Sequence, residues 1–373
     1  IYVTEESYGF LTSLDTLIES YSGDNSGDRD YQYWDRSHNL KEDYRNKTRY
    51  GVSGKELELP ALTLIAILNN ALKKIERGLA KAFDTKRGVY YSYFINEVKE
   101  HEIIKEHFVM PKKFALKKLP LFLEGQMHAL RLSKNPKEAG SLYKGTKLSG
   151  LYDKNLKSYK VTAALAGEPL EIGRCRVFTP GWLENESIWL HMEYKYLLEV
   201  LKSGLYEEFY QDFKNALVPF QDPQKYGRSI LENSSFMVSS AFPDKKLHGN
   251  GFVARLSGST AEFLQMWLIM NSGKTPFFLN ERNELNLRLQ PLLAGWLFDR
   301  QGNYSFNFLG QVYVVYHNPK RKNTFGSNSV KPKKIIFNDA KGNPIEIPSG
   351  IIPSPFAEQV RSRKIKRIDL YLE

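Results

Sequence analysis

The sequence has little cysteine and no long apolar run. Cys175 is its one cysteine among 373 residues, so an internal disulfide is excluded, and this usage suits a reducing compartment. No apolar run approaches the ~20 residues that a transmembrane helix needs, and no charged-then-apolar signal segment opens the chain. We therefore expect a cytoplasmic protein without a membrane partner.

What remains is the composition of a folded, basic protein. Hydrophobic residues make up 42% of the chain, enough for a large core and two domains. The net charge of +11 is spread widely, and its densest runs lie at residues 320–322, 331–334 and 361–367. None of these runs carries a nucleic-acid-binding motif. We expect them to be solvated surface, and we expect no nucleic-acid partner.

The spacing of apolar residues changes near residue 273. Before this point it predicts helices at residues 60–83, 119–132, 153–165 and 206–218. After it, short β-type runs alternate with Gly, Asn and Pro turns at residues 285–289, 304–309, 312–316, 334–337, 344–347 and 368–372. The pattern predicts an α+β protein with a helical domain over residues 1–273 and a β-rich sandwich over residues 274–373.

Two stretches, residues 180–191 (PGWLENESIWLH) and residues 255–261 (RLSGSTA), place small and polar residues directly before a long apolar helix. Backbone N–H groups and the helix dipole at such a start can hold an anion. The two stretches therefore predict a phosphate pocket. His191 would lie on the first of the two helices, within its first two turns.

The bounds of these helices follow from their flanking residues. The first is predicted from about Glu186 to Ser203, because Asn185 can cap it and Gly204 can end it in the left-handed conformation. Its apolar residues fall nearly all round the helix, which predicts a buried helix. The second is predicted to start after Thr260 and to run to Gly273.

Residues 21–39 combine turn-forming residues with acids, bases and aromatic rings, and we interpret them as a functional loop. Within the loop, Asp35 is flanked by Trp34 and Arg36. An aromatic wall can desolvate a carboxyl group and keep it protonated near neutral pH, as a general acid requires. A structural salt bridge from Asp35 to Arg36 or Arg29 is the alternative.

Residues 219–255 form a second long irregular stretch, and such stretches in compact domains are usually binding loops. Glu232 and Asn233 within it are polar groups of the kind that a sugar needs.

The two motif stretches resemble those of the inverting β-glucoside phosphorylases of glycoside hydrolase family 94. The family's forms are roughly Pro-Gly-x-x-Glu-Asn-Gly-x-x-x-x-His and Leu-Thr-Gly-Thr-Ala, and residues 180–191 and 256–261 (LSGSTA) are similar to them. Asp35 would take the place of the family's general acid, with Asp30 as the alternative. The elaborated loops and the strand-rich tail look closer to the β-1,3-glucan phosphorylases of family 149.

This resemblance implies an (α/α)6 barrel followed by a small jelly-roll-like domain. Residues 1–273 would form the second half of the barrel. Because the sequence begins with Ile1 rather than methionine, we expect the upstream part of the same protein to complete the barrel and to supply a phosphate-binding arginine. A homodimer is a further possible assembly.

The resemblance also implies the roles of individual residues. His191, Ser257 and the Gly258 backbone would hold phosphate. The sugar subsites would be lined by Trp34, Arg36, Glu184, Asn185, Glu232 and Asn233. The reaction would be phosphorolysis of a β-linked glucan or oligosaccharide, most simply β-1,3-linked, to α-glucose 1-phosphate with inversion. Phosphate is a substrate, so neither a cofactor nor a metal is expected.

Two other functions fit the same residues. An inverting hydrolase on the same barrel would need a second carboxylate facing Asp35, and Glu184 could serve as this base. A non-catalytic carbohydrate-binding protein would need neither Asp35 nor His191. Phosphate dependence of product formation separates the phosphorylase from the hydrolase.

Overall fold

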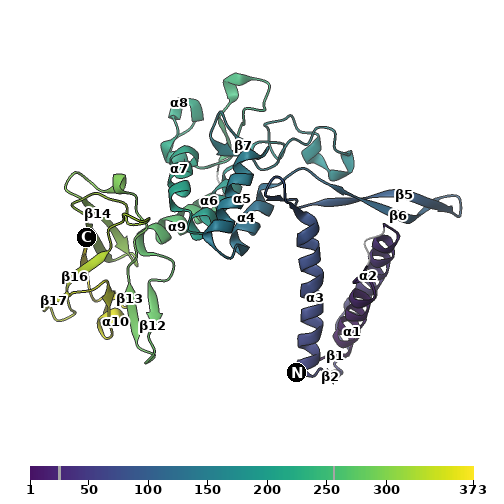
Figure 1. The fold of residues 1–373 in the computed structure, drawn as a ribbon, viewed down its shortest axis with the longest axis horizontal. Helices are drawn as coiled ribbons and strands as arrows, with labels where there is room; N and C mark the ends of the chain where they lie inside the picture. Colours follow the sequence, from purple (N-terminus) through teal and green to yellow (C-terminus); the bar gives the residue numbers. More distant parts are fainter. Residues whose placement is uncertain (24–26, 255–256) are drawn as a thin grey trace. The chain divides into compact units, whose positions relative to one another are not determined.

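The computed structural model describes residues 1–23, 27–254 and 257–373. Helices and strands both contribute along the chain (Figure 1), so the predicted α+β class is confirmed. The chain divides into two compact units, Ile1–Gly125 and Gln126–Glu373. Across the described ranges, every helix is too short or too polar to cross a lipid bilayer.

The first unit is built on three helices, α1 (Glu5–Ser20), α2 (Gly27–Thr48) and α3 (Ala61–Ala82). Strands β1 (Tyr2–Thr4) and β2 (Glu56–Glu58) form an antiparallel pair beside them. Thr4 caps α1, since its hydroxyl accepts a hydrogen bond from the Ser7 N–H (3.3 Å). Helix α1 contacts both α2 and α3. The three helices therefore form one packed layer around α1.

Helix α3 confirms the helix predicted at residues 60–83, but its apolar residues do not all enter a core. Ile67 is buried. By contrast, several apolar residues of α3 have exposed fractions of 44–81%: Leu62, Ile65, Leu68, Leu72, Ile75 and Leu79. The helical spacing therefore predicted the helix, but it did not predict which of its faces is buried against the rest of the protein.

The functional loop predicted at residues 21–39 is wrong, because most of it belongs to α2. A turn is described at residues 21–23, α2 begins at Gly27, and residues 24–26 lie outside the described ranges. Along α2, Tyr31, Trp34 and His38 form a row of rings, with centroid separations of 6.1 Å and 5.7 Å. Tyr31 and Trp34 also pack edge-on against Phe114. This tertiary packing stabilises a helix whose sequence resembles a loop.

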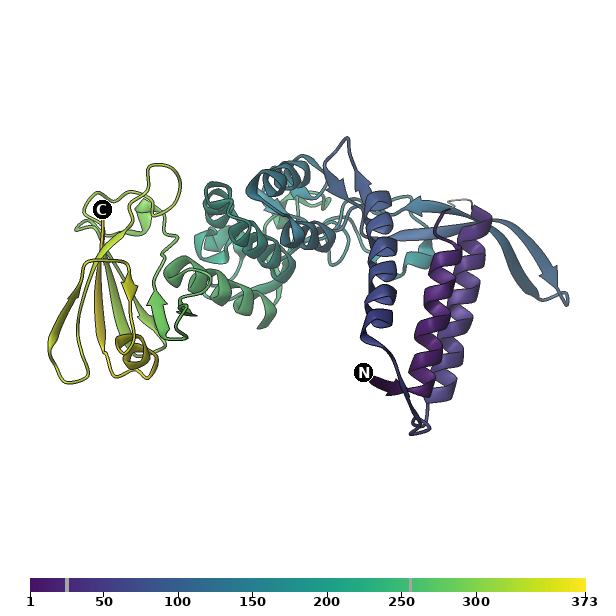
Figure 2. The ribbon, with the colours of Figure 1, turned by 60° about the horizontal axis from the view of Figure 1, so that its bottom comes forward.

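Two hairpins complete the first unit. The short one pairs β3 (Phe83–Asp84) with β4 (Val89–Tyr90), and the long one pairs β5 (Phe94–Ile104) with β6 (Phe108–Lys118). Figure 2 shows the long hairpin as a two-stranded ribbon. Strand β6 contacts α2 along the Phe114 side. Helix α4 (Leu123–Leu132) then crosses the border between the units, and it begins four residues later than predicted.

The second unit gathers its helices around α6 (Leu190–Lys202), which contacts α7 (Tyr206–Ala216) and α9 (Ser257–Ser272). Leu190, Leu197 and Val200 of α6 are fully buried, so the prediction of a buried helix is confirmed. The remaining helices of this part are α5 (Pro136–Leu148) and the short α8 (Pro223–Tyr226).

Helix α6 starts later than predicted, and Asn185 is not its cap. Ile188 and Trp189 form strand β9, which pairs with β10 (Ser234–Met237), so sheet pairing takes the residues assigned to the first helical turn. Gly204 follows the helix with a φ of +84°, as expected of a left-handed terminator. Helix α9 begins at Ser257, not after Thr260, because residues 257–260 already form its first turn.

Two further predictions in this unit are wrong. The helix predicted at residues 153–165 is a hairpin of β7 (Tyr152–Asp153) and β8 (Ser158–Tyr159), because the Asp153 carboxylate accepts hydrogen bonds from the N–H groups of Asn155 and Leu156 (3.0 and 3.1 Å). The stretch at residues 219–255 is not irregular throughout. It contains β10 and β11 (Gly251–Ala254), which form a three-stranded sheet with β9.

The C-terminal part of the second unit is β-rich and contains all six predicted strands. One sheet has the order β12 (Phe277–Leu279), β13 (Leu285–Arg288) and β18 (Ile351–Ile352). The other has the order β14 (Asn303–Phe308), β15 (Val312–His317), β19 (Arg367–Leu372), β16 (Pro332–Asn338) and β17 (Pro344–Ile347). The pairing of β15 with β19 is parallel, and the other pairings are antiparallel.

A short helix, α10 (Phe356–Arg361), contacts β13. The rings of Phe277 and Phe308 stack at 5.9 Å and join the two sheets. The predicted boundary at residues 273/274 falls between the end of α9 and β12, inside the second unit.

Candidate functional site

The candidate acid Asp35 lies in the middle of α2, in the first unit. Its neighbour Trp34 is 44% exposed and packs on rings, namely Tyr31, His38 and Phe114. The Arg36 guanidinium carbon lies 5.9 Å from the centroid of the Tyr21 ring. Asp35 therefore lies on the same helix as a row of aromatic rings, and the Arg36 guanidinium lies over the ring of Tyr21, which follows α1.

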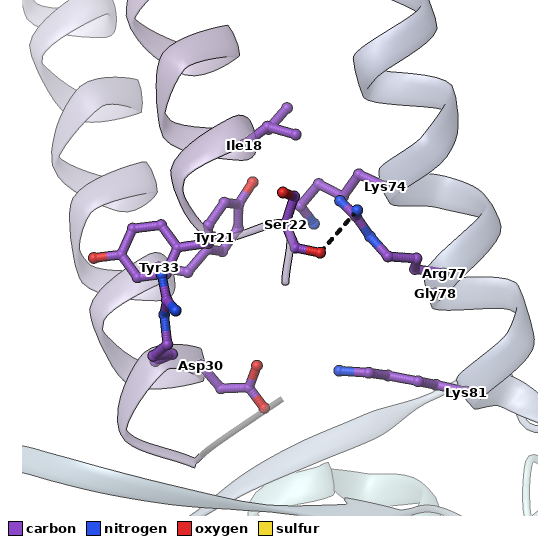
Figure 3. A pocket seen from close by; sticks show the side chains of 10 residues that line it. Ile18, Tyr21, Ser22, Asp30, Tyr33, Lys74, Arg77, Gly78 and Lys81 are labelled. Carbon is purple, nitrogen blue, oxygen red and sulfur yellow. Dashed lines mark hydrogen bonds between the residues drawn. The ribbon is translucent and has the colours of Figure 1, made fainter. Parts of the chain in front are cut away.

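The alternative acid, Asp30, lies one turn earlier on α2 and lines a cavity between α1, α2 and α3 (Figure 3). Lys74 and Lys81 of α3 line the same cavity. In Figure 3, Lys81 and Asp30 point toward one another across it. The two candidate acids thus occupy different settings, Asp35 beside rings and Asp30 among cations.

In the second unit, the His191 ring lies against the start of α9. A Cβ atom added to Gly258 would lie 2.5 Å from Cε1 and 2.6 Å from Nδ1 of His191. Such distances exclude any side chain at residue 258 unless the ring moves away. The two predicted motifs therefore meet, and the expected direction of the His191 ring is confirmed.

The carboxylate of Glu262 lies close to this ring. It lies one turn after Gly258 on α9, and its Oε1 is 3.8 Å from Nε2 of His191. The side chains are 34% exposed for His191 and 14% exposed for Glu262. The contact is an ion pair only when the imidazole is protonated. Glu262 was missed in the sequence, although its i+4 spacing from Gly258 places it on the same helix face.

Asn233, a predicted sugar ligand, reaches the same helix start. Its Nδ2 donates to Oγ1 of Thr260 (3.4 Å), and its Oδ1 accepts from the Tyr194 hydroxyl (3.4 Å). Tyr194 lies on α6 and also accepts from the Val218 N–H (3.0 Å). Asn233 thus links α6 to α9 beside Gly258. Ser257 begins α9 in the same place, but its side chain lies outside the described residues, as does Arg255.

The loop before β9 is held by packing. Gly181 has a φ of +83°, and a Cβ there would lie 2.5 Å from the Phe242 nitrogen. The Trp182 ring packs on Phe236 and Phe252, at 5.1 and 4.7 Å. The Pro-Gly-Trp part of the motif therefore has a local structural role.

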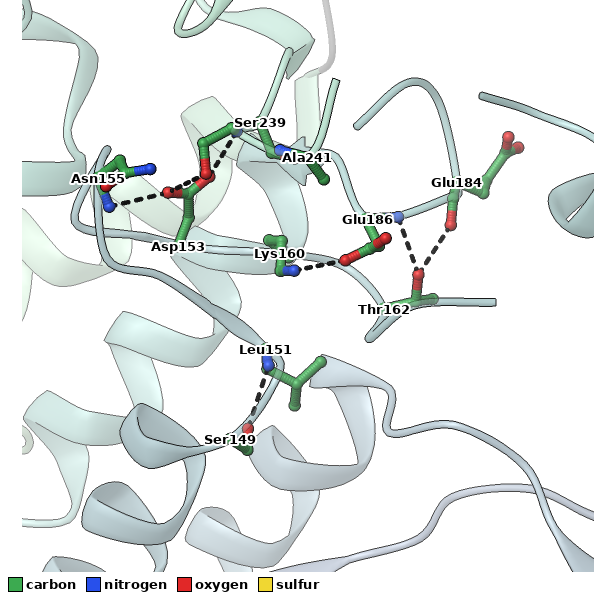
Figure 4. A network of polar contacts seen from close by, with 11 residues as sticks. Ser149, Leu151, Asp153, Asn155, Lys160, Thr162, Glu184, Glu186, Ser239 and Ala241 are labelled. Atoms are coloured by element: carbon green, nitrogen blue, oxygen red, sulfur yellow. Dashed lines mark hydrogen bonds and ion pairs between the residues drawn. The ribbon is translucent and has the colours of Figure 1, made fainter. Parts of the chain in front are cut away.

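The predicted sugar ligands of this loop, Glu184 and Asn185, have protein partners. Asn185 is 2% exposed, and its Nδ2 donates to the Phe178 carbonyl (2.7 Å). Glu184 accepts from Arg174 (2.9 Å) through Oε1, and its carboxylate points away from the network in Figure 4. The adjacent Glu186 pairs with Lys160 at 2.7 Å.

Glu232 lies directly before Asn233, and its side chain is 41% exposed. Its Oε1 is 3.3 Å from an Arg228 nitrogen. Its carbonyl accepts from the Tyr226 hydroxyl (2.8 Å). The backbone at residue 232 is therefore anchored, and the carboxylate remains at the surface.

The first turn of α6 contains a buried acid, Glu193. Glu193 is fully buried, and its Oε1 accepts from the Tyr159 N–H (2.7 Å). Burial, followed by the negative charge of Asp212, raises the pKa of Glu193 well above its usual value. Asp212 itself accepts from the hydroxyls of Tyr143 and Tyr159 (2.8 and 2.6 Å). This network fixes the helix on which His191 lies.

No protein-family model matches the chain, and no curated protein matches it at a significant level.

Proposed function

We propose that the protein is an inverting β-glucan phosphorylase, similar to those of glycoside hydrolase families 149 and 94. The helical part would belong to an (α/α)6 barrel, and the C-terminal sheets would form the jelly-roll-like domain. The observation that supports this most is the position of the His191 ring on Gly258, since it brings together the two motifs on which the resemblance rests.

The start of α9 suits a phosphate dianion for two reasons. The first N–H groups of a 16-residue helix have no partner within the helix, and the dipole favours negative charge at this end. His191 lies beside the same turn and can donate a charge-assisted hydrogen bond. Glu262, 3.8 Å from Nε2, can orient the imidazole.

The sugar would lie next to this phosphate, along the side marked by Asn233 and Glu232. In the reaction, a phosphate oxygen forms a bond to the anomeric carbon while the glucosidic C–O bond breaks on the opposite face. Asp35 gives its proton to the leaving oxygen. The products are α-glucose 1-phosphate and a glucan shortened by one residue. Phosphate replaces the water and the base of a hydrolase, so a second carboxylate is not needed.

The decisive test is the phosphate dependence of product formation. We expect the full-length protein to release α-glucose 1-phosphate from a β-1,3-linked oligosaccharide with phosphate present, and no sugar without it. Panels of β-1,2- and β-1,4-linked oligosaccharides establish the linkage. Phosphorus NMR distinguishes the α anomer from the β anomer. Release of free glucose without phosphate would identify a hydrolase, and binding without turnover would identify a carbohydrate-binding protein.

A further inference from the structure

Helix α3 turns a polar side toward α1 and leaves its apolar side exposed. Asn70 donates from Nδ2 to the Asp15 carboxylate on α1 (2.9 Å), and Arg77 donates from Nη1 to the Ser22 carbonyl just after α1 (3.1 Å). By contrast, the large apolar residues with exposed fractions of 44–81% form one stripe: Leu62, Ile65, Leu68, Leu72, Ile75 and Leu79. A helix at the surface of a folded protein normally has the opposite arrangement. The stripe therefore needs a partner that covers it.

The stripe has the spacing of a coiled-coil seam. From Ile65 to Leu79, its residues are separated by three, four, three and four positions. This is the a and d pattern of a heptad, which presents a narrow apolar row to another helix. Asn70 and Arg77 each lie two positions from residues of the stripe, so they fall on the other side of α3. The spacing therefore predicts that the partner is a helix.

Gly78 supplies a second observation at the edge of the stripe. It lies inside α3, where glycine is less favourable than alanine because it loses more backbone freedom. A Cβ atom added to Gly78 would meet none of the described residues within 4 Å, so their packing does not require glycine here. Gly78 directly precedes Leu79 and lies three positions after Ile75. A glycine at this place lets the backbone of a second helix approach closely.

The positions that flank the stripe favour a second copy of α3 over a different helix. On one side lie Leu64, Ala71 and Gly78, and on the other side lie Asn69 and Glu76. Such flanking positions select the partner of a coiled coil through opposite charges. Glu76 is the single charged residue among these five, so two α3 helices do not bring rows of like charge together. The same residues offer no row of charge that would select a different helix.

The area of the stripe fits the interface of a dimer. The exposed fractions of its six residues together correspond to about three and a half fully exposed residues. At roughly 100 Å² of apolar surface for each Leu or Ile, this is about 350 Å² per copy and about 700 Å² for two copies. An interface of ~1,200 Å², the lower end of the specific class, is about 57% apolar and so contains ~700 Å² of apolar surface. Two stripes therefore supply the apolar area that a dimer needs.

We propose that α3 pairs with the α3 of a second copy of this chain as a two-helix coiled coil. The stripe forms the seam, and the two backbones come close at Gly78. The proposal does not depend on the proposed function, because none of the residues assigned to catalysis, phosphate or sugar lies on α3.

Sedimentation equilibrium of the full chain tests the pairing. We expect a monomer–dimer equilibrium, and Leu72→Glu should raise its dissociation constant about a hundredfold or more, because two carboxylates would enter an apolar seam. Leu72 is 55% exposed, so the variant should fold normally, as circular dichroism can confirm. Ala66→Glu is the matched control, since it places the same charge on an exposed residue of α3 outside the stripe. A wild-type chain that remains monomeric, or equal effects of the two substitutions, would overturn the proposal.

Gly78→Gln separates association from folding. Glutamine is a better helix former than glycine, and its Cβ has open space among the described residues. Measured below the dissociation constant, the monomer should therefore unfold at a temperature about a few degrees higher. In the dimer the same side chain obstructs the second helix, so the dissociation constant should rise about tenfold. Misfolding cannot produce weaker association together with higher thermal stability. An unchanged dissociation constant in this variant also contradicts the proposal.

Hydrogen exchange at several protein concentrations identifies what covers the stripe. The amides of α3 should exchange several-fold more slowly as the concentration rises through the dissociation constant, because the second helix stabilises α3. The amides of β15 in the second unit are the control and should not change. A dimer that releases no α-glucose 1-phosphate would reject the proposed function and support the pairing of α3. Slow exchange of α3 at every concentration, in a monomer, would assign the stripe to another segment of the same chain and overturn the pairing.

Discussion

The two units offer an anion different partners. The start of α9 in the second unit offers backbone N–H groups, a helix dipole and the His191 imidazole. The described lining of the cavity in the first unit includes the exposed cations Lys74, Arg77 and Lys81 and the acid Asp30. Donors fixed by a helix select an anion by geometry, whereas clustered cations attract it by charge and are weakened by salt. Recognition by geometry and recognition by charge can therefore be compared within one chain.

The largest expected effect concerns Asp35, the proposed general acid. Asp35→Asn should lower phosphorolysis by about 10²–10⁴-fold, the contribution of general acid catalysis. Because Asp35 lies on α2 away from the buried core, the variant should fold normally. The measurement is the rate of α-glucose 1-phosphate release, with circular dichroism to confirm the fold.

Asp43→Asn is the matched control for this change, since Asp43 is an exposed acid on the same helix. It should keep normal turnover. If Asp30→Asn loses activity while Asp35→Asn keeps it, the acid lies in the cationic cavity. The comparison then breaks, because the cavity would be part of the catalytic site.

The next effect concerns phosphate at α9. His191→Ala should weaken phosphate binding by about 1.5–3 kcal/mol, the range for hydrogen bonds to charged groups, or about 10- to 150-fold. Glucan binding should change little. His101→Ala, an exposed histidine on β5, is the matched control. A variant that loses affinity for glucan and keeps its affinity for phosphate would refute the assignment of His191.

Gly258→Ala should reproduce the loss seen in His191→Ala. The added methyl group would occupy space 2.5 Å from the ring, so the imidazole must move away from the helix start. The double variant should then lose little more than either single variant, because both remove the same contact. Phosphate KM for the four proteins of this cycle is the measurement. Fully additive losses would show that the two residues act separately.

Salt should have a smaller effect on phosphate binding at α9. A tenfold increase in NaCl should raise the phosphate KM only a few-fold, because backbone N–H groups at the helix start supply much of the binding and are fixed by the helix. The measurement is the phosphate KM at two salt concentrations. A rise of tenfold or more would show that net charge, and not the helix start, holds the phosphate.

The sequence predicted the α9 site better than the cavity for a physical reason. Small residues before an apolar run are a local signal, and the meeting of His191 with Gly258 followed from two such signals. The cavity depends on α1, α2 and α3 packing so that Lys74, Arg77 and Lys81 face Asp30, which no local pattern contains. The same limit explains α2, where the row of rings on Phe114 outweighs turn-forming residues.

Strands were predicted more reliably than helix starts. All six predicted strands of the C-terminal part exist, because Gly, Asn and Pro turns separate their alternating patterns. The start of α6 was wrong because β9 pairs with β10, a partner distant in the sequence. Asn185 resembles a cap locally, but its side chain bonds the Phe178 carbonyl instead.

The smallest expected effect on function concerns Glu193, which is buried in the first turn of α6, the helix that carries His191. Burial in the folded protein raises the pKa of Glu193 above its value in the unfolded chain. At a pH between these two pKa values, Glu193 is protonated in the native state and ionised in the unfolded state. Stability is then highest below the unfolded value, ~4.3, and falls as pH rises through that window. Glu193→Gln keeps an acceptor for the Tyr159 N–H and cannot ionise. Its free energy of unfolding should therefore decline less between about pH 5 and 8, while phosphate KM stays near normal. Urea unfolding across this range measures both slopes. If the free energy of unfolding declined equally with pH in the wild-type protein and in Glu193→Gln, Glu193 would not be protonated in the folded state.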